Sequence, residues 1–187
     1  MTGMDRQALR LPTALTGMLL PVIAILLLEL LGLQGPLEYR RYLLVREPWR
    51  LLTAHFVHLS LVHAMLNAAA LLLLERLFAD RLRRVELWLL LLATPVLISL
   101  CLWVVLPDLS WYRGLSDVLH AIFFAGCVVW IRTTTGQARW LPVLAVVVGA
   151  AKVLYEQPWD ASLPYRDWLG AAVVPQAHLA GALIGIA

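Results

Sequence analysis

Ser116 and His178 are the residues with which this chain could carry out nucleophilic chemistry. Ser116 opens an apolar segment two residues after Gly114, and His178 lies inside the last apolar run. A serine hydroxyl becomes an effective nucleophile when a neighbouring base removes its proton. Polar groups within apolar segments are costly and are therefore candidates for function. The simpler alternatives are that Ser116 only caps a helix and that His178 only joins two helices.

The spacing of small residues predicts that these two segments pack against each other. On a helix, Gly181 and Gly185 share the face of His178. Small residues at this spacing let two helices approach closely. The segment after Ser116 has small residues of its own, at Ala121, Ala125 and Gly126. We therefore expect the hydroxyl and the imidazole to come within hydrogen-bond distance, about 2.6–3.2 Å.

A second group of polar residues lies in an earlier apolar segment. His63 and Asn67 are four residues apart and so share one helical face. Both side chains can donate hydrogen bonds, as an oxyanion hole requires, and so can the backbone N–H of Ser116 at a helix start. His58 lies off that face and is expected to tie the preceding connection to the helix. No His-Glu-x-x-His occurs and no carboxylate accompanies these histidines, so we expect no metal and no cofactor.

Composition places these residues in a membrane. The chain has 187 residues, of which 61% are hydrophobic and 14% charged, and its mean hydropathy is +0.80. A helix crosses a bilayer with about 20 apolar residues. The sequence therefore predicts an all-α polytopic membrane protein, a single domain over 1–187. Six spans are expected, at 12–33, 57–78, 85–106, 114–131, 140–156 and 170 to the end.

The charged residues fit membrane topology better than nucleic-acid binding. The net charge is +3, but most basic residues lie in connections between apolar runs and form no stripe interleaved with aromatics. Eight Lys and Arg lie on the amino-terminal side of the predicted membrane and six on the other, which favours a cytoplasmic amino terminus. Cys101 and Cys127 fall inside apolar segments and are expected to be buried thiols.

In its motifs the chain resembles the rhomboid family of intramembrane serine proteases. The resemblance implies a six-helix bundle in the bacterial inner membrane, with a site that opens to the periplasmic side. It also implies a Ser–His dyad without an orienting aspartate, an oxyanion hole, and transmembrane proteins as substrates. The motifs, in chain order, are Trp49-Arg50, His63-x-x-x-Asn67, Gly114-x-Ser116 and Ala177-His178-x-x-Gly181.

Three further stretches are similar to the rhombosortase branch of that family: 53–58, 114–120 and 152–157. This similarity implies cleavage of exported proteins near a Gly-Gly motif that precedes a carboxy-terminal membrane anchor. His120 occupies a place where bacterial rhomboids often carry tyrosine beside the catalytic histidine, so we assign it a supporting role. The connection 157–168 is the expected gate through which a substrate helix bends.

Asp117 departs from the family pattern, which usually has glycine after the nucleophile. A carboxylate pointing into the site would oppose a forming oxyanion. We expect Asp117 instead to face water at the helix start, where a negative charge is favourable. Lys152 and Glu156 are four residues apart and are expected to neutralise each other near the outer interface.

Three other functions are compatible with parts of the sequence. A catalytically inactive relative that binds transmembrane segments would explain Asp117. A haem-bearing bundle would need facing histidine pairs at matched depth, which the spacing does not supply. A transporter is disfavoured because the two halves of the chain show no inverted repeat.

Overall fold

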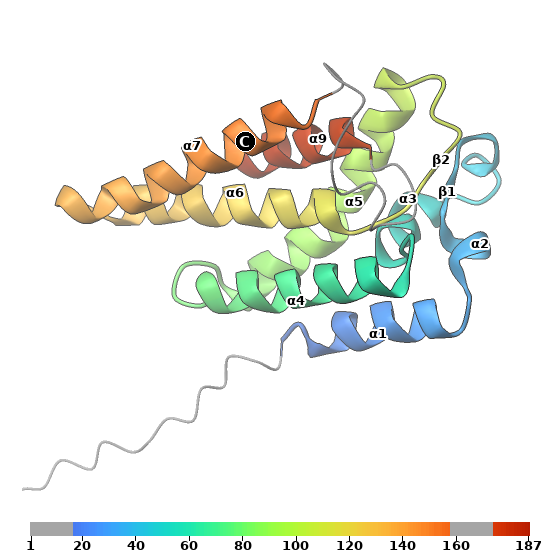
Figure 1. The fold of residues 1–187 in the computed structure, drawn as a ribbon, viewed down its shortest axis with the longest axis horizontal. Coiled ribbons are helices and arrows are strands. Elements are labelled where there is room, and N and C mark those ends of the chain that lie inside the picture. Colours follow the sequence, from blue (N-terminus) through green and yellow to red (C-terminus); the bar gives the residue numbers. More distant parts are fainter. Residues whose placement is uncertain (1–16, 158–173) are drawn as a thin grey trace, which may run out of the picture.

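The structure, a computed structural model, describes residues 17–157 and 174–187, and these form a helical bundle. In Figure 1, α1, α4 and α6 run side by side, α7 and α9 lie beyond α6, and α5 crosses the bundle obliquely. The longer described helices are α1 (Leu19–Leu30), α4 (Leu61–Leu77), α5 (Arg84–Val105), α6 (Ser116–Thr133), α7 (Trp140–Tyr155) and α9 (Pro175–Ile186). The shorter elements are α2 (Gln34–Leu37), β1 (Tyr39–Arg40), η2 (Arg41–Leu43), α3 (Arg50–Thr53), η3 (Ala54–Phe56), β2 (Trp111–Tyr112) and η4 (Gly136–Arg139).

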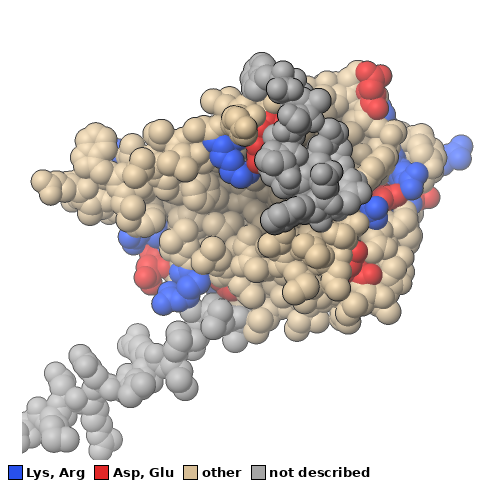
Figure 2. All heavy atoms as spheres, in the orientation of Figure 1, with Lys and Arg blue, Asp and Glu red and all other residues tan. Residues whose placement is uncertain are grey.

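Several of these helices have the length and apolar composition of membrane spans. Among the described residues these are α5, α6 and the segment Gly136–Tyr155, and a fourth is the pair Arg50–Phe56 and Leu61–Leu77, bent by 94°. The face in Figure 2 is mostly uncharged, with Lys, Arg, Asp and Glu gathered in a few clusters. The structure agrees with the expected all-α membrane fold, whereas the number of six crossings stays a prediction.

Among the helices that begin later than the sequence predicts, two have starts fixed by a polar or a proline residue. The helix expected from 57 begins at Leu61, since the Ser60 side chain accepts a hydrogen bond from the backbone N–H of His63 at 3.2 Å. The helix expected from about 170 begins at Pro175, a residue that suits a first helical position. The predicted gate over 157–168 lies, except for Gln157, outside the described residues.

The connection between α1 and α4 folds around the buried side chain of Arg50. Its guanidinium donates to the carbonyl oxygens of Gly35 at 2.9 Å and Glu38 at 2.6 Å, and it pairs with Glu47 at 2.5 Å. A buried cation needs hydrogen-bond partners, and here Nε and Nη1 of Arg50 donate to three oxygen atoms. β1 of this connection pairs antiparallel with β2, just before α6. The contacts of Arg50 therefore hold together a connection whose strand β1 pairs with the residues just before α6.

α9 packs directly on the backbone of α6, as the small residues predict. A Cβ atom at Gly181 would overlap the carbonyl oxygen of Asp117, and one at Gly185 would overlap that of Ala121. Gly126 serves a different contact, because a Cβ there would lie 2.5 Å from the Phe78 ring. The two glycines of α9 thus bring the first turns of α6 and α9 together.

Candidate active site

The structure joins Ser116 and His178 by a hydrogen bond. Ser116 Oγ lies 2.8 Å from His178 Nε2. Ser116 is the first residue of α6, and Leu115 occupies the N-cap position before it. His178 lies in the first turn of α9 and is buried. The hydroxyl and a potential base are therefore within proton-transfer distance.

Gly114 sets the path of the chain into Ser116. Its φ of +128° is a conformation that favours glycine, and a Cβ atom would lie 2.9 Å from His63 Cε1. The Gly114 N–H donates to the Ala54 carbonyl at 3.1 Å, and the Tyr112 hydroxyl donates to the Gly114 carbonyl at 3.1 Å. Burial, and then the charge of Asp117, raise the pKa of Tyr112 well above its usual value, so Tyr112 remains a donor.

Two side chains were predicted to donate to an oxyanion, those of His63 and Asn67. The structure places His63 in the lining of the site cavity, but not Asn67. His63 lines the same cavity as Ser116 and His178. Its Nδ1 accepts from the backbone N–H of Leu59 at 3.4 Å, which leaves the proton of the neutral ring on Nε2 as a free donor. Asn67 lies one turn further along α4, donates to the His63 carbonyl at 3.0 Å, and is absent from the described lining of that cavity.

His58 packs against His63 edge-on, with ring centroids 5.0 Å apart at 88°. It is fully buried, and neither ring nitrogen has a hydrogen-bond partner among the described residues. The expected tie between the first connection and α4 therefore takes the form of ring packing and not of a hydrogen bond.

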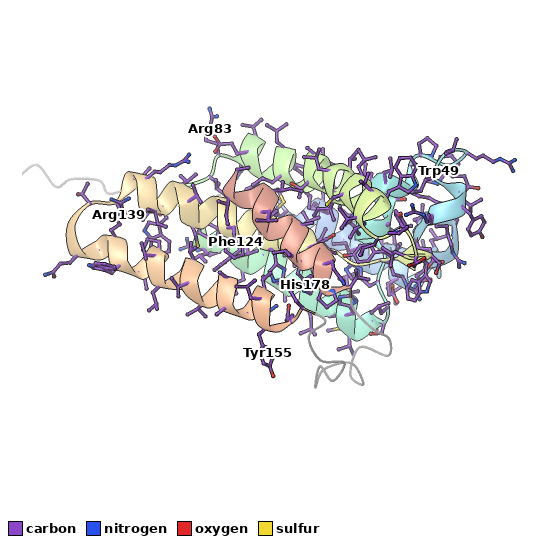
Figure 3. All side chains as sticks on the ribbon, turned by 90° about the horizontal axis from the view of Figure 1, so that it is seen from above. Trp49, Arg83, Phe124, Arg139, Tyr155 and His178 are labelled. Carbon is purple, nitrogen blue, oxygen red and sulfur yellow. The ribbon has the colours of Figure 1, made fainter. Side chains whose placement is uncertain are left out.

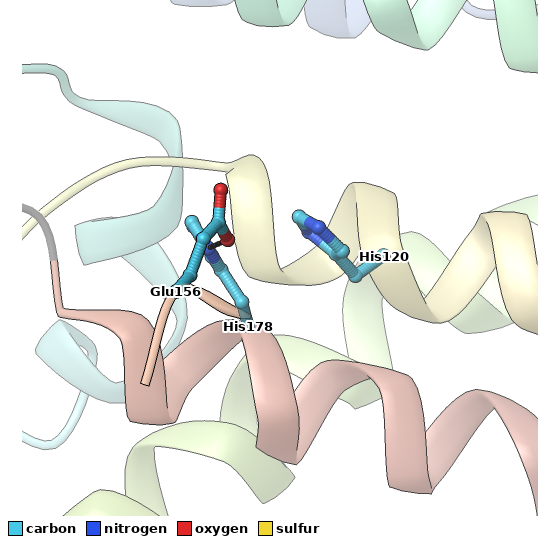
Figure 4. A group of neighbouring side chains, drawn as sticks. All are labelled: His120, Glu156 and His178. Carbon is cyan, nitrogen blue, oxygen red and sulfur yellow. Dashed lines mark hydrogen bonds and ion pairs between the residues drawn. The ribbon is translucent and has the colours of Figure 1, made fainter. Parts of the chain in front are cut away.

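Glu156 contacts His178 from the end of α7, a contact that the sequence analysis missed. Its Oε2 lies 2.9 Å from His178 Nδ1, the interaction drawn in Figure 4. The predicted pair with Lys152 is also present, at 2.7 Å between Nζ and Oε1. Tyr155, the preceding residue, points away from the bundle, whereas His178 lies within it (Figure 3). The sequence signals for Glu156 were a charged i, i+4 pair at the end of an apolar span and the similarity of 152–157 to the rhombosortase branch.

His120 lies between the serine and α7. Its ring stacks on that of His178, with centroids 4.5 Å apart and planes inclined by 20°. His120 Nδ1 is 2.6 Å from the Ser116 carbonyl oxygen, and Nε2 is 3.2 Å from Lys152 Nζ. These contacts place His120 beside the Ser116–His178 pair, and its supporting role stays a prediction.

The prediction that Asp117 faces water is wrong. Asp117 is fully buried, and its carboxylate oxygens lie 3.1 Å and 3.0 Å from His55 Nδ1. Ser99 Oγ donates to a backbone carbonyl, so it accepts the proton of His55 Nε2 at 3.0 Å. The Nδ1 proton is then shared between His55 and Asp117. The pair has no net charge, and no uncompensated carboxylate stands beside Ser116.

We expect Asp117→Ala to destabilise the fold. Removing one partner of a buried pair costs about 3–5 kcal/mol, because the other is left without compensation. The free energy of unfolding in mixed micelles measures this loss. Asp117→Ala combined with His55→Leu should cost less than the sum of the single changes, by about 1–3 kcal/mol. The exposed Asp80→Ala serves as control, and equal stability of Asp117→Ala and Asp80→Ala would contradict the buried pair.

Ser116 lines two of the cavities that the described residues enclose. The smaller has a volume of about 230 Å³ and is lined by polar and apolar side chains. The larger has a volume of about 530 Å³, is lined almost entirely by apolar surface, and lies between α4, α6 and α7. The smaller is lined by Leu59, His63, Asp108, Leu109, Ser110, Trp111, Tyr112, Arg113, Ser116, Val174 and His178. The larger is lined by Ala70, Leu73, Leu74, Ser116, Leu119, His120, Phe123, Ala145, Val148, Gly149 and Lys152.

The side chains of His120, Glu156 and His178 each offer an atom of a type that binds metal ions, within 4.8 Å of one another (Figure 4). The ammonium group of Lys152 lies 2.7 Å from Glu156 and 3.2 Å from His120. A metal cation would have to displace this ammonium group and the hydrogen bonds of both imidazoles. The arrangement favours a hydrogen-bonded cluster, and the absence of a metal requirement stays a prediction.

Comparison with known proteins agrees with this geometry. The model of the rhomboid domain family matches residues 45–187, which include every candidate site residue. The rhomboid proteases GlpG of Salmonella paratyphi A, Salmonella newport and Salmonella typhi are each 27% identical over 143 residues, or 75% of this chain and 47% of the relative. The chain thus spans about half the length of these relatives. Since the family match covers most of the chain, the protein belongs to the rhomboid family.

Proposed function

We propose that the protein is an intramembrane serine endopeptidase, with Ser116 as nucleophile and His178 as general base and acid. The observation that carries this proposal is the 2.8 Å hydrogen bond between Ser116 Oγ and His178 Nε2. The two residues come from different helices, and both line a cavity. The relatives named above are rhomboid proteases, which supports the same chemistry.

The geometry supports acyl transfer in two steps. As Ser116 Oγ bonds to the scissile carbonyl carbon, its proton moves to His178 Nε2 and the carbonyl electrons move onto oxygen. The Ser116 N–H at the start of α6 and the His63 Nε2–H are the donors available to that oxyanion. The proton on Nε2 then passes to the leaving amine as the peptide bond breaks. Water hydrolyses the acyl-enzyme by the same proton transfers.

The buried pair of Asp117 and His55 removes the main reason to favour an inactive relative. That alternative rested on a carboxylate beside the nucleophile. Because the pair is neutral overall, it does not oppose an oxyanion through net charge. The Ser116–His178 bond is also formed, as an active enzyme requires.

The cavities support a transmembrane substrate with small residues at the cleavage point. The apolar cavity between α4 and α7 suits an apolar helix and reaches Ser116. The catalytic cavity of about 230 Å³ is below the roughly 300–1,000 Å³ of typical small-molecule sites. Both features fit cleavage near a Gly-Gly motif before a carboxy-terminal anchor, as in the rhombosortase branch. The corresponding location is the bacterial inner membrane, with the site open to the periplasm.

Fluorophosphonate labelling of the detergent-purified protein tests the proposed chemistry. The reagent forms a stable bond only with an activated serine, so we expect one labelled peptide, which contains Ser116. In His178→Ala, labelling should slow by about 100-fold or more, because the general base is absent. A folded wild-type protein that stays unlabelled, or a label on another residue, would overturn the proposal.

A further inference from the structure

We propose that Glu156 and Lys152 of the α7 end are positioning residues for His178: they hold its imidazole in the tautomer that accepts the Ser116 proton. This inference rests on the proposed serine peptidase function. It replaces the expected dyad by a Ser–His–Glu arrangement, in which Lys152 fixes the orientation of the carboxylate.

With both imidazoles neutral, the hydrogen bonds among the described residues fix which ring nitrogens carry protons. The Ser116 carbonyl can only accept, so His120 Nδ1 carries a proton and Nε2 accepts from Lys152. Lys152 can only donate, and it also donates to Glu156 Oε1. Glu156 Oε2 accepts the Nδ1 proton of His178, which leaves Nε2 unprotonated toward the Ser116 hydroxyl. The five residues form a closed ring in which His178 is ready to act as base.

The positions of the helix ends explain why a carboxylate is needed. His178 lies in the first turn of α9 and faces the first residue of α6. Helix amino termini carry partial positive charge, which favours an oxyanion but opposes an imidazolium ion. Glu156, at the carboxy-terminal end of α7, supplies the opposite charge 2.9 Å from the ring. The carboxylate therefore stabilises the charge that forms on His178 when it takes the proton.

Lys152 orients this carboxylate through its contact with Oε1. Glu156 is only 4% exposed, so an uncompensated negative charge there would be costly. The Lys152 side chain is 52% exposed, which leaves its ammonium group partly hydrated while it contacts Oε1. The second oxygen, Oε2, then faces His178.

The closed circle of hydrogen bonds predicts an unusual order of effects among substitutions of Glu156. In Glu156→Gln, the amide oxygen should face Lys152, which can only donate, so the amide N–H₂ faces His178 Nδ1. His178 then carries its proton on Nε2 and cannot accept one from Ser116. Glu156→Ala imposes no such tautomer. Glu156→Gln should therefore be the more damaging change, by about tenfold over Glu156→Ala, although it is the closer isostere.

The rate of fluorophosphonate labelling measures this order, without a need for the natural substrate. We expect labelling to slow by about 10³-fold in Glu156→Gln and about 10²-fold in Glu156→Ala, in line with tautomer effects in serine proteases. Adding Lys152→Met to Glu156→Gln frees the amide to rotate and should restore at least about tenfold. Glu75→Gln, which removes a buried carboxylate from α4, is the matched control and should label at the wild-type rate.

Three outcomes distinguish the possibilities. Glu156 variants that label at the wild-type rate would overturn the inference and leave the serine peptidase intact. Loss of labelling that is equal in Glu156→Gln and Glu156→Ala, with no recovery on adding Lys152→Met, would also overturn it. A wild-type protein that does not label would instead overturn the proposed function itself.

A measurement on the wild-type protein covers the case in which the variants do not fold. Nitrogen-15 NMR of histidine-labelled protein reports which ring nitrogen carries the proton, and a His178→Asn sample identifies the signal of His178. We expect the proton of the neutral ring on Nδ1. A proton on Nε2 would overturn the inference.

Discussion

Ser116→Ala is expected to lower cleavage of a membrane-anchored reporter by about 10⁴-fold or more, the loss seen when a serine nucleophile is removed. The hydroxyl is hydrogen-bonded to His178, and loss of one such bond costs only about 1 kcal/mol of stability. The thermal unfolding midpoint should therefore change little. The assay uses protein in liposomes and a reporter with a Gly-Gly pair before a carboxy-terminal transmembrane segment.

The matched control is Thr133→Val, which removes a hydroxyl from the other end of the same helix. It should cleave the reporter at the wild-type rate. A second reporter, with Val-Val in place of Gly-Gly, should be a poor substrate if the cavity lined by Ser116 and His178 accepts only small side chains. Residual cleavage by Ser116→Ala above about 1% of wild type would show that another group is the nucleophile.

Gly181→Ala is expected to reduce turnover by about 100-fold through the packing of α9 on α6. The added methyl would overlap the Asp117 carbonyl oxygen and lie 2.8 Å from its carbon, so the two helices must separate. Ser116 is adjacent to Asp117, and His178 lies one turn before Gly181, so the separation acts directly on their hydrogen bond. A misplacement of about 1 Å can cost about 100-fold in rate.

Gly35→Ala provides the comparison for this change, because a Cβ atom there meets nothing within 4 Å. It should leave turnover and the unfolding midpoint unaffected. For Gly181→Ala, the maximal rate should fall more than the apparent affinity for the reporter, since the defect lies in the reacting groups. Wild-type turnover in Gly181→Ala would mean that α9 does not pack on α6 as described.

The parts of the fold that the sequence predicts well are those determined by local pattern. Apolar runs of membrane length give the helices, and Gly181 and Gly185 give the close contact of α9 with α6. The boundaries were less accurate where one residue decides them, as Ser60 does for α4. The structure places three residues of the family motifs in the lining of one cavity: Ser116, His178 and His63. The catalytic roles of these residues stay predictions.

The contacts that escaped sequence analysis are those between residues distant in the chain. Asp117 is buried because His55, 62 residues away, occupies the space beside it. Glu156 reaches His178 only because the end of α7 meets the start of α9, across a segment that no periodicity describes. In both cases the sequence singled out the charged residue, but the identity of its partner depended on tertiary packing.

Because Glu156 lies at the end of α7, its contact with His178 depends on the position of this helix. α7 buries only Pro142 and Val153 among its residues and presents much of its apolar surface outward. It also forms one wall of the apolar cavity through which a substrate helix would enter. If the protein has the proposed peptidase activity, an outward swing of α7 that widened this entrance would withdraw the Glu156 carboxylate from the His178 imidazole. Admission of a substrate helix and bond cleavage would then be successive states.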